Sequence, residues 1–189
     1  MNEPALKLFM VLLGCKPEGR FTEQHDVFFG VAASLKDLVP DLINFWPEAK
    51  GKLHVDAWRE IQQVNGYDVA ITARVKSTPL PGAASLFFIN LGGYKKDDFE
   101  EFHYKMIVAA PGKGEAILLS KQTAFYQHTG FKGATSHIDD KYGIDVDDFF
   151  ELADILDDQY KNQYSIILTP ATAEKPDPIH LGYLKLDKL

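Results

Sequence analysis

An internal repeat constrains this chain more than any other feature. The segment LFMVLLGCKPEGRFTEQHDVFF, residues 8–29, aligns without a gap with LFFINLGGYKKDDFEEFHYKMI, residues 86–107. Seven of the 22 aligned positions are identical, which is several times what shared composition would give. The identities at Leu8, Phe9, Leu13, Gly14, Phe21, Glu23 and His25 recur at Leu86, Phe87, Leu91, Gly92, Phe99, Glu101 and His103. We therefore predict an internal duplication of one module.

The repeat also copies pairs of polar residues that suit a functional site. Glu-x-His recurs at an offset of 78 residues, and His-x-Asp in LHVDAWREI aligns with SHIDDKYGI at an offset of 83. On a strand, residues two apart share a face, so each pair can present two groups together. Such groups bind a divalent metal, or a carboxylate orients a histidine that acts as a base. The candidates are Glu23, His25, His54 and Asp56, and Glu101, His103, His137 and Asp139.

A purely structural role is the alternative for these positions, and the sequence alone favours it over a functional site. Polar residues that cap strand ends or satisfy loop backbone groups would be copied by a duplication just as faithfully. The basic residues of the preceding loops allow two interpretations as well. They contact an anionic ligand beside the histidines, or they are a solvated charged surface. These residues are Lys16, Arg20, Lys95 and Lys96.

The apolar run that ends at Cys15 resembles a bacterial lipoprotein signal, but the repeat argues against that reading. The same run and glycine recur in mid-chain, at residues 86–93, where no signal peptide acts. We expect a buried strand and a cytoplasmic protein, because a single cysteine fits a reducing compartment. Cys15 is then a packed small residue, and a nucleophile paired with His25 is the less favoured alternative.

Hydrophobic patterns predict an α+β fold. We expect two similar ββαββ-like modules around mixed sheets, related by a pseudo-two-fold axis. Each module opens with buried and following strands, at 6–13 and 25–33, then 86–91 and 103–110. Helices are predicted over 34–46, divided by Pro40, and over 113–126. Asn65 and Gly66 predict a hairpin turn between 52–63 and 67–75.

The expected domain boundaries follow the repeat. The first module covers 1–77, a linker rich in proline and glycine covers 78–85, and the second module covers 86–189. The second module carries an additional acidic helix, at about 146–158, and two closing strands at 164–169 and 180–186.

Composition limits the classes of partner. The formal net charge of −7 argues against a nucleic-acid surface, which draws on a basic face. No apolar run approaches the ~20 residues of a membrane helix. We therefore expect a small molecule or a protein as partner, and no nucleic acid or membrane. The sequence leaves the oligomeric state open.

The stretch LLGCKPEGRFTEQHDVFFGVAASLKDLVPDLINFWPEAKGKLHVDAWREI, residues 12–61, resembles a small bacterial family catalogued as domain of unknown function fifteen-forty-three. The resemblance is close over residues 8–62 and weaker over the second copy. It implies one or two copies per protein, in agreement with the repeat, and it implies no activity. The residues on its motif positions are Gly14, Glu23, His25, His54, Asp56 and Trp58.

Two functional hypotheses follow from the sequence. The favoured one is a non-catalytic ligand- or protein-binding protein, since duplicated modules form clefts suited to ligands. The alternative is a metal-dependent hydrolase or isomerase that uses the Glu-x-His and His-x-Asp pairs. The second hypothesis requires those pairs to lie close enough to share one divalent ion.

Overall fold

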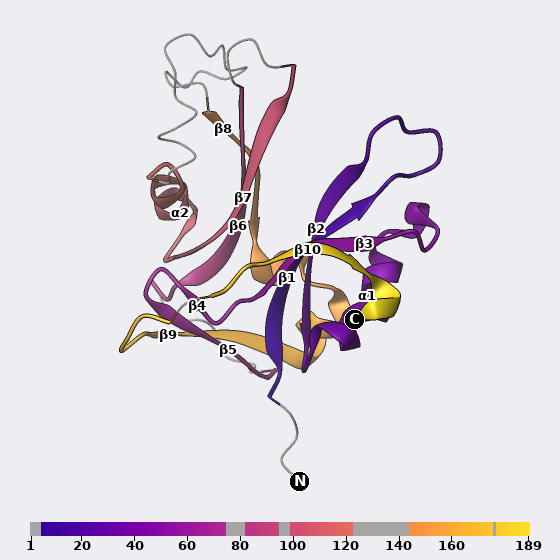
Figure 1. Ribbon diagram of the computed structural model, residues 1–189. Helices are drawn as coiled ribbons and strands as arrows, with labels where there is room; N and C mark the ends of the chain where they lie inside the picture. Colours follow the sequence, from indigo (N-terminus) through magenta and orange to yellow (C-terminus); the bar gives the residue numbers. More distant parts are fainter. Residues whose placement is uncertain (1–4, 75–81, 95–98, 123–143, 176) are drawn as a thin grey trace. The chain divides into compact units, whose positions relative to one another are not determined.

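The computed structural model describes residues 5–74, 82–94, 99–122, 144–175 and 177–189 (Figure 1). The chain divides into two compact units. Unit 1 contains residues 1–76 and 156–189, and unit 2 contains residues 77–155. Antiparallel sheets and a few short helices make up both units, so the predicted α+β class is confirmed. No helix in the described part of the chain is long and apolar enough to cross a membrane.

The main sheet of unit 1 is built around the first apolar run. Strand β1 (Lys7–Cys15) lies between β2 (Gln24–Ala32) and β3 (His54–Glu60), and β10 (His180–Lys185) pairs with the other edge of β3. Alternate residues of β1 point to one face, and those of the core face are fully buried. They are Phe9, Val11, Leu13 and Cys15.

A helical connection joins β2 to β3. A 3-10 turn (Leu35–Leu38) runs into α1 (Val39–Phe45), and a second 3-10 turn (Pro47–Ala49) follows. Pro40 lies in the first turn of α1, where its missing N–H costs nothing, so it divides the helical segment as predicted. The apolar side chains of this segment, Leu35, Leu38 and Leu42, are buried.

A second sheet of unit 1 joins the end of the first module to the C-terminal region. Strands β4 (Gln63–Val64) and β5 (Tyr67–Ala73) form the predicted hairpin, and β5 pairs with β9 (Tyr164–Pro170). Asn65 and Gly66 have φ angles of 48° and 81°, the left-handed conformations that a tight hairpin turn needs. Helix α5 (Asp158–Gln163) precedes β9, and a 3-10 turn (Leu186–Lys188) follows β10.

The described part of unit 2 contains a three-stranded sheet and two helices. Strand β6 (Ser85–Tyr94) lies between β7 (Glu101–Ala110) and β8 (Ile144–Glu151). Helix α2 (Lys113–Ser120) covers one face, where its Ala116 packs in a core with side chains of β6 and β7. Helix α4 (Leu152–Ile155) follows β8 directly.

The strands β2, β1 and β3 of unit 1 and the strands β7, β6 and β8 of unit 2 share an irregularity in their pairing. The pairing of β1 with β3 shifts register between Leu12 and Leu13, and that of β6 with β8 shifts between Asn90 and Leu91. These positions are 78 residues apart, the offset of the sequence repeat. The strand order and the bulge therefore correspond between the units, as a duplication predicts.

Three expectations are wrong. The acidic segment predicted as a helix over 146–158 is strand β8 up to Glu151, because pairing with β6 decides its conformation, and only its second part contains helix, in α4. Residues 156–189 belong to unit 1 and not to a second module ending at 189, because β9 and β10 pair with β5 and β3. The sheets were expected to be mixed, but all strand pairs among the described residues are antiparallel. Residues 78–81 of the predicted linker 78–85 lie outside the described residues, and Ser85 begins β6.

Candidate metal centre

Three neighbouring strands bring together the four candidate residues of the first copy. Glu23 immediately precedes β2, and His25 lies in that strand; His54 and Asp56 lie on one side of β3. Gly14 of the central strand pairs with both His25 and His54. We call the group Glu23, His25, His54 and Asp56 the unit 1 cluster.

Glycine at position 14 makes room for these side chains. A Cβ atom there would lie 2.3 Å from His54 Nε2 and 2.4 Å from Asp56 Oδ2, far inside van der Waals contact. The side chains therefore occupy the volume that any larger residue would fill. A turn does not explain the glycine at the end of the apolar run, because Gly14 lies within regular β1. The need for space above this position does explain it.

The four side chains form a ring in which nitrogen and oxygen ligands alternate. Nε2 of His25 lies 3.2 Å from Asp56 Oδ2 and 3.8 Å from Glu23 Oε2. Nε2 of His54 lies 3.3 Å from Asp56 Oδ1 and 3.2 Å from Glu23 Oε1. Each carboxylate thus faces both imidazoles, and both imidazoles present the same nitrogen.

Burial makes this ring unusual. His54 is only 5% exposed, and its Nε2 atom and Asp56 Oδ2 are buried without a hydrogen-bond partner. Leaving a buried polar atom unpaired costs about 1–3 kcal/mol, so such atoms call for an explanation. Glu23 and His25 are roughly half exposed and open the cluster to solvent on their side.

Three of the four imidazole–carboxylate distances lie in the range found between ligands of a divalent transition metal, although each carboxylate approaches the two imidazoles through different oxygens. Ligands at the ~2.0–2.1 Å typical of zinc are about 3.3–3.4 Å apart in a tetrahedron, and octahedral neighbours are about 3.0 Å apart. Three of the four distances around the ring are 3.2–3.3 Å. Two imidazole nitrogens and two carboxylates are a donor set for Zn²⁺, Fe²⁺, Mn²⁺ or Ni²⁺.

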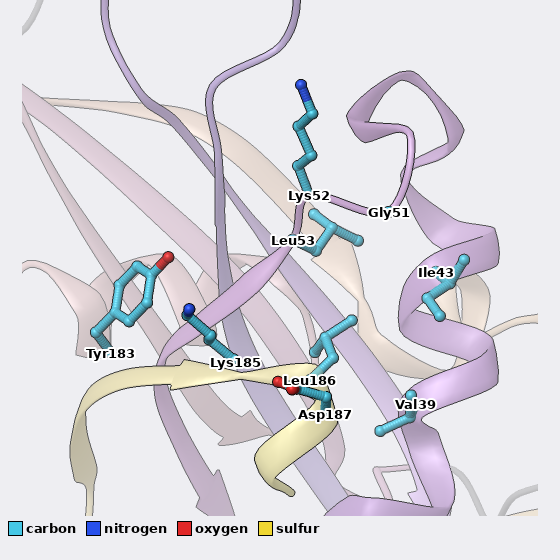
Figure 2. Close-up of a pocket in the computed structure, with 9 residues that line it drawn as sticks. All are labelled: Val39, Ile43, Gly51, Lys52, Leu53, Tyr183, Lys185, Leu186 and Asp187. Atoms are coloured by element: carbon cyan, nitrogen blue, oxygen red, sulfur yellow. The ribbon is translucent and has the colours of Figure 1, made fainter.

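A pocket of about 510 Å³ adjoins the cluster within unit 1. Val39 and Ile43 of α1 line one side, and Tyr183 and Lys185 of β10 line the other (Figure 2). The Tyr183 ring also packs on the His54 imidazole, with centroids 4.2 Å apart. One aromatic ring therefore both lines the pocket and contacts a candidate ligand.

The loop between β1 and β2 exposes the basic candidates and one aromatic residue. Lys16 and Arg20 are exposed, as is Phe21, at 97%. Phe99, its equivalent before β7, is also fully exposed. Lys95 and Lys96 lie outside the described residues. A solvent-exposed phenylalanine adds nothing to a core. Its presence at the same position of both sequence repeats is therefore a feature of the candidate site that the motif analysis did not include.

Unit 2 contains a related group, which we call the unit 2 cluster: Glu101, His103 and Asp147. One potential ligand atom of each lies within 4.8 Å of the others. His103 Nε2 is 3.3 Å from Asp147 Oδ2 and 4.0 Å from Glu101 Oε2. Glu101 and His103 correspond to Glu23 and His25, whereas the sequence analysis did not select Asp147.

The alignment of the second His-x-Asp pair needs correction. His137 and Asp139 lie outside the described residues. In unit 1, β3 pairs with β1; the corresponding strand of unit 2, which pairs with β6, is β8. Its register matches Asp145 and Asp147 to His54 and Asp56, at an offset of 91. A common pattern of valine, aspartate, any residue and an aromatic at Val55–Trp58 and Val146–Phe149 would have revealed it.

Cys15 is not part of the cluster. It follows Gly14 in β1, so its side chain points to the opposite face, where it is fully buried. Burial, reinforced by the Glu23 carboxylate and opposed by Lys52, raises the pKa of its thiol. These conditions disfavour a thiolate nucleophile, and they agree with the expectation of a packed small residue.

Comparisons with known proteins bear on the fold and on one segment. A crystal structure of protein Il1583 from Idiomarina loihiensis is similar, with a TM-score of 0.64 and 23% identity over 96% of this chain and 97% of that one. This similarity shows the fold alone. A search of curated proteins found no match. Residues 20–71 match the family model described as Domain of Unknown Function (DUF1543), and this segment, which is similar to that family, contains the whole unit 1 cluster.

Proposed function

We propose that this protein binds a divalent transition-metal ion at the unit 1 cluster and uses it to act on a small molecule. The single observation that carries the proposal is the approach of two imidazoles and two carboxylates around a buried His54 Nε2 that makes no hydrogen bond to a described residue. The approach of the two pairs to each other supports the metal-dependent hypothesis over a non-catalytic binding module. An alternative without metal would pair each histidine with a carboxylate by ordinary hydrogen bonds. It leaves the orientation of His54 Nε2 unexplained.

Hydrolysis is the reaction class that the cluster supports best, and isomerisation is the second. An ion with open coordination positions polarises a bound water or a substrate oxygen. The exposed side of the cluster, at Glu23 and His25, gives solvent and substrate access. The neighbouring pocket suits a small organic substrate, because apolar side chains in its lining are combined with two cations, Lys52 and Lys185, and one carboxylate, Asp187.

We also infer that unit 2 is a second copy of the module and that the protein works in the cytoplasm. The matching strand order and bulge support the duplication. The single buried cysteine supports a reducing compartment.

The first experiment compares the metal content of the untagged protein, purified without chelator, with that of variants. His25→Ala removes a ligand that is partly exposed, so the variant should fold. His180→Ala is the matched control, because His180 stacks on Trp58 and lies outside the cluster. Metal content is measured by mass spectrometry after dialysis against equimolar Zn²⁺, Mn²⁺, Fe²⁺ and Ni²⁺ under reducing, anaerobic conditions.

We expect one ion per chain at this cluster, lost in His25→Ala and kept in His180→Ala. Retention of that ion by a folded His25→Ala variant would contradict the proposal, as would a wild-type protein that binds none of the four metals. A screen of phosphate, carboxylate ester and amide substrates with the loaded protein then tests the reaction class.

A further inference from the structure

The unit 2 cluster occupies the same positions on its sheet as the unit 1 cluster. Glu101 and His103 lie at the start of β7, Glu23 and His25 lie just before and in the start of β2, and Gly92 pairs with His103 as Gly14 pairs with His25. Asp147 lies on the strand that corresponds to β3. The three residues therefore come from two separate strands that meet across a glycine of the central strand.

The glycine of this central strand is required in the same way. A Cβ atom on Gly92 would lie 2.2 Å from Asp147 Oδ2, so the carboxylate lies over the glycine just as Asp56 lies over Gly14. An exposed acidic residue on a strand has no general reason to fold over the neighbouring strand. Here it approaches the His103 Nε2 atom to 3.3 Å, nearly the 3.2 Å between Asp56 and His25.

The donor set differs from that of unit 1 in one respect. The register position of His54, which supplies the second imidazole, is taken by Asp145 in unit 2. The unit 2 cluster, Glu101, His103 and Asp147, therefore has one imidazole and two carboxylates. Nitrogen ligands favour zinc and other late transition metals, while carboxylates favour harder ions such as Mn²⁺ and Mg²⁺.

We infer that Glu101, His103 and Asp147 form a second divalent-cation site, which discriminates less strongly in favour of Zn²⁺ over Mn²⁺ than the unit 1 cluster does. The inference extends the proposed function and rests on it for the comparison with unit 1. Two sites of unequal hardness would let one chain hold two different ions.

The test counts Mn²⁺ ions per chain on the whole metal-stripped protein by electron paramagnetic resonance of free Mn²⁺. The matched variants are His25→Ala for unit 1 and His103→Ala for unit 2. Asp147→Asn is a second unit 2 variant that keeps the side-chain shape. Asp148→Asn is its control, since Asp148 pairs with Asn90 on the neighbouring strand and is not in the cluster. Circular dichroism verifies that each variant is folded.

We expect two Mn²⁺ ions in the wild type and in Asp148→Asn, and one in each of the other variants. Zn²⁺ added to the Mn²⁺-loaded protein should displace the ion of unit 1 at a lower concentration, by at least about tenfold. If the wild type binds one ion, and this ion is kept in His103→Ala and lost in His25→Ala, the second site is overturned and the proposed function stays intact. The opposite pattern would overturn the proposed function and leave the second site. Binding of no ion would overturn both, and displacement of both ions at one Zn²⁺ concentration would overturn the difference in selectivity.

Discussion

Gly14 lies directly beneath His54, so that a single methyl group on the glycine would come within 2.3 Å of the imidazole Nε2 atom. The contact links a backbone position in the central strand to the geometry of a side chain in its neighbour. It also provides a test of the site that leaves all four candidate ligands in place.

We expect Gly14→Ala to weaken metal binding by at least about tenfold, because His54 and Asp56 must move away from the added methyl group. Alanine is otherwise favoured over glycine in a strand by about 0.5–1 kcal/mol, so the sheet itself should tolerate it. Metal affinity measured by equilibrium dialysis, with urea denaturation alongside, checks this. The control is Gly112→Ala, where no atom lies within 4 Å of the new Cβ atom. Unchanged affinity in Gly14→Ala would contradict the role of the glycine.

Tyr183 should support the cluster by holding the His54 ring in place. We expect Tyr183→Leu to weaken metal binding about tenfold, since groups that orient a ligand contribute 10–100-fold to affinity. Tyr183→Phe keeps the ring contact and should bind metal like the wild type. Calorimetric titration of both variants measures the effect, and equal loss in both would mean that the hydroxyl group, and not the ring, matters.

The sequence predicted the strands of the repeat well because their apolar runs are long and end at glycine. It also identified the unit 1 cluster, since strand alternation alone places Glu23 with His25 and His54 with Asp56. The segment at 144–151 could not be predicted in this way. Val146, Phe149 and Phe150 are spaced as on a helix face, and only pairing with β6, more than fifty residues earlier, makes the segment a strand. The same long-range pairing hid Asp147, whereas the sequence alignment selected His137 and Asp139, which lie outside the described residues.

The return of the C-terminal region to unit 1 was equally invisible in local patterns. Its partners β3 and β5 lie about a hundred residues earlier in the chain, and no local spacing encodes which strand a segment will meet. Tyr183, which depends on that pairing, was consequently missed as a neighbour of His54.

The hydrogen bond from the Tyr160 hydroxyl to Asp41 should stabilise unit 1, because it ties α5 to α1. Tyr160→Phe is expected to lower the free energy of unfolding by about 1–2 kcal/mol at neutral pH. Urea denaturation measures the change. Gln159→Ala, which removes a weaker and more exposed contact with the same carboxylate, is the comparison and should cost less.

Tyr160 also makes the stability of the folded protein depend on pH in the alkaline range. Burial, and then the Asp41 carboxylate, raise its pKa well above the ordinary value of 10.0. The folded state therefore keeps a proton that the unfolded state loses above about pH 10, so stability falls as the pH rises from there. We expect Tyr160→Phe to flatten this fall in denaturation curves recorded between pH 9 and 11. An equally steep fall in the variant would assign it to other groups.

Cys15 should react slowly with thiol reagents in the native protein. Its side chain is fully buried, and its raised thiol pKa lowers the thiolate fraction further. Labelling with Ellman's reagent at pH 8 should be at least about a hundredfold slower without guanidinium than with it. Rapid labelling of the folded protein would instead indicate that the end of β1 opens readily.

Phe21 should be dispensable for folding. It is almost completely exposed, so we expect Phe21→Ser to change the free energy of unfolding by less than about 0.5 kcal/mol. Phe28→Ser, which alters a buried residue of β2, serves as the contrast and should unfold the protein or destabilise it severely. A marked loss of stability in Phe21→Ser would mean that its ring has a structural partner.

Unit 1 is interrupted by unit 2 along the chain, and this order has a consequence for biosynthesis. A ribosome delivers the strands of the unit 1 cluster first, then the whole of unit 2, and only afterwards β9 and β10. Until those two strands emerge, the outer edge of β3 has no β10 beside it, and His54 lacks the ring of Tyr183. During translation, the nascent chain thus exposes candidate ligands for roughly a hundred residues of elongation, at about 5–20 residues per second. The sheet that shelters these ligands is therefore complete only after β10 has emerged.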